Sequence, residues 1–74
     1  MNLSPNFLIT LLIQNGFVLV RAKGSHQIFR NPITGKTIIV PVHGGKDMKK
    51  GTLLRIIKQA GIDKSAINRY YFGR

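Results

Sequence analysis

A chain of 74 residues is the size of one domain, predicted to span residues 1–74, and lies near the lower limit for a self-sufficient hydrophobic core. The absence of cysteine excludes disulfides and cysteine-based metal sites, and nothing in the composition indicates an oxidising compartment. Twelve Lys and Arg against two Asp and Glu give a net charge of +10, which favours a phosphate backbone as partner ahead of an acidic membrane or protein.

A first helix is predicted over residues 5–14. Ser4 is a good N-cap, Pro5 suits the first helical position, and Gly16 supplies a stop. The helix is apolar nearly all round, so its outer surface should be covered either by the aromatic residues 70–72, the favoured alternative, or by a partner. No basic segment precedes it, no cleavage site follows, and it is too short to span a bilayer, so we expect a cytoplasmic protein.

Three short runs rich in β-branched residues follow, at residues 17–22, 26–30 and 37–42, and they are predicted to be strands. Gly24 lies in the first connection, where its freedom to adopt positive φ suits a turn. The short connections predict an antiparallel meander. Pro41 cannot donate a hydrogen bond to a ladder, so the third strand should be at an edge there or be ending.

A second helix is predicted over about residues 49–59, with Asp47 as a candidate cap and Gly61 as its stop. Asp63 should cap a short last helix that runs to about residue 71. The order α-β-β-β-α with a short extra helix predicts an α+β fold, a two-layer sandwich with helices on one face of the sheet. Double-stranded-RNA-binding domains share this order, but the analogy concerns the fold and assigns no function.

Few side chains could carry out catalysis. Asp47 and Asp63 are the only carboxylates, and both are better explained as caps than as an acid–base pair. The two histidines and two acids do not fall at a familiar ligand spacing, so neither a metal site nor another cofactor is expected. The stretch Gly44-Gly45-Lys46 lacks the spacing of a phosphate-binding P-loop.

The remaining candidates, His26 and His43 among many cations, suit the cleavage of RNA. The ribose 2′-OH is an internal nucleophile, a histidine that titrates near neutrality can move a proton, and Lys or Arg can stabilise phosphoryl charge without a metal. DNA lacks the 2′-OH and would not be cleaved by this route. From residue type alone, a structural or surface role remains the commoner outcome for His26, and a solvated loop position for His43.

Three lysines near the start of the second helix, Lys46, Lys49 and Lys50, would not stabilise that helix, because cations are disfavoured at a helix N-terminus. They would suit a phosphate there. We therefore interpret them as functional rather than as a merely solvated run.

Several motifs together resemble the HicA toxins (the YcfA-like group) of bacterial and archaeal toxin–antitoxin pairs. The resemblance runs from about Leu3 to Ile62. The motifs are Gly16-Phe17, Gly24-Ser25-His26, Pro41 with His43, and Lys50-Gly51-Thr52-Leu53.

This resemblance implies a double-stranded-RNA-binding-like fold, an mRNA interferase that blocks translation, and a HicB antitoxin that masks it. The catalytic histidine of the family lies in its Gly-Ser-His motif, which corresponds to His26 here. Gly24 and Ser25 would form the turn that presents the imidazole ring. His43 also matches a family position, without an implied catalytic role.

The sequence thus leads to a metal-independent RNA endonuclease in which His26 acts as general acid or base. Its expected partners are mRNA and HicB, with no membrane, and the free chain should be a monomer or weak dimer. A non-catalytic RNA-binding module of the same fold is the main alternative, and a membrane-active basic peptide is a third. The residues expected to hold phosphates are Arg21, Lys23, Lys46, Lys49 and Lys50.

Overall fold

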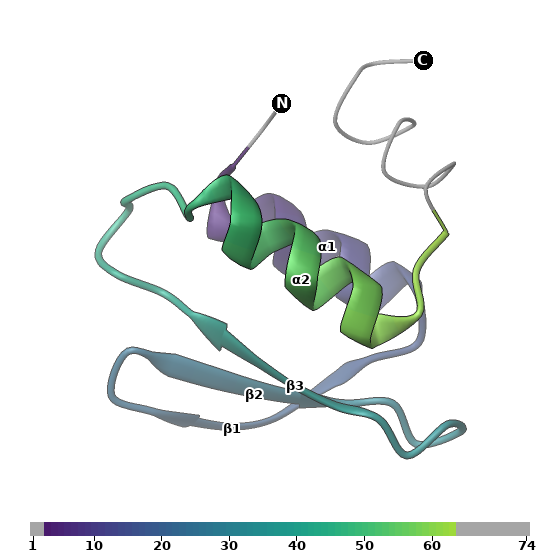
Figure 1. The fold of residues 1–74 in the computed structure, drawn as a ribbon. Coiled ribbons are helices and arrows are strands. Elements are labelled where there is room, and N and C mark those ends of the chain that lie inside the picture. Colours follow the sequence, from purple (N-terminus) through teal and green to yellow (C-terminus); the bar gives the residue numbers. More distant parts are fainter. Residues whose placement is uncertain (1–2, 64–74) are drawn as a thin grey trace.

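The computed structural model describes residues 3–63, which form two helices and three strands (Figure 1). The predicted element order is confirmed, with boundaries that differ by one residue at most. The short helix predicted after Asp63 and the aromatic residues 70–72 lie outside the described residues. The elements are α1 (Pro5–Gln14), β1 (Val18–Lys23), β2 (His26–Arg30), β3 (Thr37–Pro41) and α2 (Lys50–Ala60).

The strands form one antiparallel sheet in the order β1-β2-β3, and both helices cover the same face of it (Figure 1). This arrangement confirms the predicted two-layer α+β sandwich of the double-stranded-RNA-binding kind. Alternation along β2 and β3 directs Phe29, Ile38 and Val40 toward the helices, where all three are buried. The helices contribute Leu8, Leu11, Leu12, Leu53, Ile56 and Ile57 to the same core.

Helix α1 begins as predicted, because the Ser4 hydroxyl accepts a hydrogen bond from the Asn6 backbone N–H and Pro5 occupies the first turn. Its exposed apolar side chains include Phe7, at 42% exposure, and Ile13, at 55%. The aromatic residues expected to cover them are outside the described range. Within residues 3–63, no helix has the length and apolar character needed to cross a membrane.

Helix α2 corrects the prediction that Asp47 is its cap. The N-cap is Lys49, whose extended backbone makes no side-chain capping bond, and the helix begins at Lys50. Asp47 is therefore two residues too early to reach the first free N–H groups. At the other end, Gly61 has a φ of 73° and its N–H bonds to the last turn, which confirms the predicted stop.

The connection between β2 and β3 is held by Asn31, a buried polar residue. Its Oδ1 accepts hydrogen bonds from the N–H groups of Ile33 (2.9 Å) and Thr34 (3.2 Å). Its Nδ2 donates to the carbonyl of Asn15 at the end of α1 (3.2 Å). One side chain thus shapes the turn and attaches it to the first helix.

Candidate functional site

The turn between β1 and β2 presents His26 at the first position of β2. Gly24 and Ser25 form a two-residue connection in which only Gly24 has positive φ, at 58°. A positive φ at the first central residue alone is the pattern of a type II′ hairpin turn, which glycine adopts readily. The Ser25 carbonyl accepts a hydrogen bond from Val42 N–H (2.6 Å), which holds the turn against the end of β3.

A bulge in β1 decides which face of the sheet carries its cations. The register shifts between Leu19 and Arg21, so that Val20 is the extra residue. Past the bulge, Arg21 lies opposite Ile28 and Lys23 lies opposite His26.

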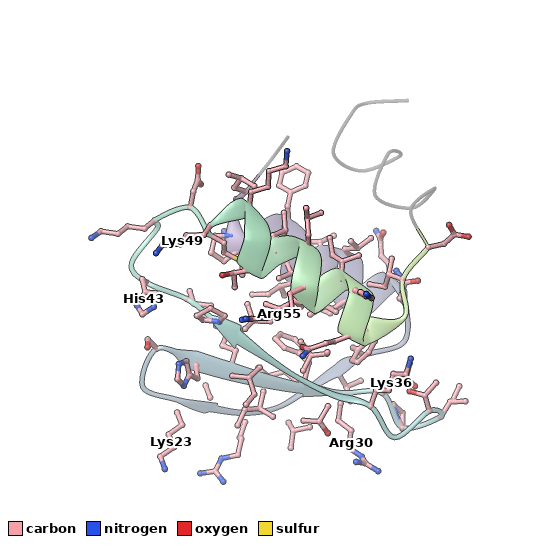
Figure 2. All side chains as sticks on the ribbon, viewed as in Figure 1. Lys23, Arg30, Lys36, His43, Lys49 and Arg55 are labelled. Atoms are coloured by element: carbon pink, nitrogen blue, oxygen red, sulfur yellow. The ribbon has the colours of Figure 1, made fainter. Side chains whose placement is uncertain are left out.

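Residues directly opposite one another in an antiparallel pair share a face, so Arg21 and Lys23 lie on the same face of the sheet as His26. With a regular register Arg21 would instead lie opposite Gln27, on the side of the helices. Figure 2 shows Lys23 and Arg30 on the side of the sheet away from the helices. The bulge therefore places Arg21 and Lys23 on the face of His26. No sequence motif indicated this bulge.

His26 also lines a groove between β3 and α2, with a volume of about 520 Å³. Its side chain is exposed there. We call this space the β3–α2 groove. The other lining residues are Thr37, Ile39 and Pro41 from β3, and Thr52, Arg55, Ile56 and Gln59 from α2.

The α2 wall of this groove contains polar residues that sequence reasoning missed, namely Thr52, Arg55 and Gln59. Their spacing of three and four residues places them on one helix face, which is the signal that could have identified them. Figure 2 shows Arg55 between α2 and the sheet. Among residues 3–63 Arg55 has no hydrogen-bond or ion-pair partner, and no carboxylate from that range lines the groove.

A second hollow of about 480 Å³ adjoins the first, because both are lined by Pro41 and Thr52. It contains three of the predicted site residues, His43, Lys46 and Lys49, together with Asp47 and Met48. Asp47 therefore faces this hollow, where its charge opposes those of the lysines.

A family model described as the HicA toxin of bacterial toxin–antitoxin systems matches residues 7–62. The chain belongs to the HicA toxin family. A search of curated proteins finds no match.

The HicA match includes every residue that lines either hollow. Of the predicted residues in this HicA chain, His26 lies in the β3–α2 groove, and His43, Lys46 and Lys49 lie in the adjoining hollow. The other predicted site residues line neither space, namely Arg21, Lys23, Gly24, Ser25 and Lys50. No group of three metal-ligating side chains occurs within residues 3–63.

Proposed function

We propose that this HicA family member acts as a toxin by cleaving mRNA, with His26 as the residue that transfers a proton. The observation that supports the proposal best is the position of His26 in the β3–α2 groove. Arg55 lines the same groove, and Lys23 is the residue opposite His26 in the β1–β2 register. A phosphodiester is the substrate that such an arrangement suits.

The proposed reaction uses the nucleophile that RNA already contains. The 2′-oxygen attacks the adjacent phosphorus while the bond from phosphorus to the 5′-oxygen breaks, which leaves a 2′,3′-cyclic phosphate and a 5′-hydroxyl. Neutral His26 would accept the proton of the 2′-OH, or protonated His26 would donate one to the leaving 5′-oxygen. Arg55 and Lys23 would stabilise the negative charge that grows on the phosphoryl oxygens. This route requires no metal.

The adjoining hollow extends the proposed site along the RNA strand. Lys46 and Lys49 would hold a neighbouring phosphate, and His43 would contact the same segment of backbone. Asp47 in this hollow would weaken the attraction, so we expect a smaller contribution to binding here than from the groove that contains His26.

Membership of a toxin–antitoxin family supports a protein partner as well. We propose that a HicB antitoxin binds this chain and blocks its access to mRNA, in the cytoplasm where mRNA is translated. A net charge of +10 favours an acidic surface on that partner.

The products of the reaction test this proposal. Purified protein is incubated with an RNA oligonucleotide and with the same oligonucleotide carrying 2′-deoxyribose at each cleaved position, each with and without EDTA. We expect fragments ending in 2′,3′-cyclic phosphate from the first and none from the second. Binding of both without cleavage of either would support a non-catalytic RNA-binding module instead. Loss of cleavage in EDTA would refute the metal-independent route.

A further inference from the structure

Strand β3 forms one edge of the sheet. The alternation of its hydrogen bonds to β2 shows which of its backbone groups are unpaired. The ladder with β2 is flanked by bonds from Val42 N–H to the Ser25 carbonyl and from Asn31 N–H to the Lys36 carbonyl. Alternate residues of an antiparallel strand bond to the same neighbour. Residues 36, 38, 40 and 42 therefore face β2, and Thr37, Ile39 and Pro41 direct their backbone groups to the free edge.

The position of Pro41 fits this assignment, because a residue without an N–H is tolerated only where that N–H would not bond to the neighbouring strand. Toward the free edge, Thr37 and Ile39 thus offer N–H and carbonyl groups, and Pro41 offers a carbonyl alone. No other described strand pairs with this edge.

The two edges of the sheet differ in how they are protected against strand pairing. Strand β1 carries a bulge at Val20 and the charged residues Arg21 and Lys23, which are the usual means of blocking an edge. Strand β3 has no charged residue and pairs regularly with β2 along its whole length. Among the strands of residues 3–63, β3 alone presents a regular, uncharged edge.

The free edge of β3 lies beside the β3–α2 groove, since Thr37, Ile39 and Pro41 also line that groove. An edge strand next to a helix is the arrangement in which an extended peptide adds to a sheet as a further strand. Five residues of β3 span about 17 Å, which is enough for a short strand. Arg55 on the opposite wall would meet the side chains of the added segment.

We propose that an extended acidic segment of a partner protein binds here as a fourth strand paired with β3. Charge selects this occupant: the chain has a net charge of +10, and no carboxylate of the described residues lines the groove. A second copy of the chain would bring the same positive charge to the contact. The added strand would cover His26, so it would compete with RNA; that consequence rests on the proposed function, whereas the pairing does not.

Amide hydrogen exchange measured by NMR tests the pairing without RNA or catalysis, so its failure would leave the proposed function untouched. The probe is an acetylated seven-residue peptide that alternates Glu and Val. Its control has the same sequence with a backbone N-methyl group on every residue, which keeps the charge and removes the N–H donors from both edges of the peptide, so that it cannot pair as a strand. At 1 mM probe, about tenfold slower exchange is expected at Thr37 and Ile39. Ile38 and Val40, already paired with β2, serve as references.

The substitution Ile39→Pro removes one edge N–H in the same way as Pro41, so the β2–β3 ladder should persist. Ile39→Pro should abolish the slower amide exchange that the probe causes at Thr37. Ile39→Thr, which keeps the N–H, should retain it. Unchanged exchange with the probe would overturn the proposal. Equal effects of the probe and its N-methylated control would show that the probe binds by charge attraction without strand pairing, which also overturns the proposal. Slow exchange that depends on protein concentration without the probe would assign the edge to a second copy. If Ile39→Pro does not fold, the two peptides still decide.

Discussion

Replacing Arg55 with glutamine tests whether the α2 wall of the groove holds a phosphate. Each phosphate contact of a single strand contributes about 0.7 to the slope of log affinity against log salt concentration. Five contacting cations give a slope of about −3.5, so binding weakens about 130-fold between about 50 and 200 mM salt. Loss of one contact changes the slope to about −2.8, and the weakening to about 50-fold. The five cations are Arg21, Lys23, Lys46, Lys49 and Arg55.

The assay is fluorescence anisotropy with a labelled RNA oligonucleotide, in a His26→Ala background so that the RNA stays intact. Lys58→Gln is the matched control, because Lys58 is an exposed cation of the same helix that lines neither hollow. We expect the Arg55→Gln slope to fall by about 0.7 and the Lys58→Gln slope to stay within error. Equal slopes for the two variants would refute the assignment of Arg55 to the RNA site.

Two further substitutions, each with a matched control, test the β1–β2 and β2–β3 turns. Gly24→Ala should cost about 1–2 kcal/mol, because a side chain is disfavoured at a φ of 58° although nothing lies within 4 Å of the added Cβ. Gly51→Ala, in a helix with equally open surroundings, should instead raise Tm. If both variants changed Tm in the same direction, the positive φ of Gly24 would not explain its effect. Asn31→Ala should lower stability by about 1–2 kcal/mol, because it removes the bonds to Ile33 and Thr34 and leaves the Asn15 carbonyl without this donor. Thr34→Ala, which removes one exposed bond, should cost under about 0.5 kcal/mol in thermal unfolding; equal losses would contradict the role of Asn31.

Local signals in the sequence were sufficient for the fold. Ser4 and Pro5 mark the start of α1, Gly61 marks the end of α2, and β-branched runs mark the strands. Each of these signals acts over a few residues, through a cap, a fixed φ or a turn. The prediction that Asp47 is a cap is wrong because a cap depends on where the helix begins, and the extended backbone of Lys49 places that start at Lys50.

The site was predictable only in part, because it depends on contacts between distant segments. The Gly24-Ser25-His26 motif identified the histidine that lines the groove. No sequence signal predicted the bulge at Val20, which places Arg21 and Lys23 on the same face of the sheet as His26. Arg55 lies 29 positions after His26 and reaches the same groove only because α2 packs along β3.

RNA cleavage by the His26→Ala and His43→Ala variants, measured beside the wild type, decides whether His26 transfers the proton. We expect His26→Ala to cleave RNA at least about 10²-fold more slowly, as when a general acid or base is removed. It should keep the wild-type Tm and affinity for RNA, and His43→Ala should retain most of the activity. Cleavage by folded His26→Ala at the wild-type rate would show that His26 does not transfer the proton.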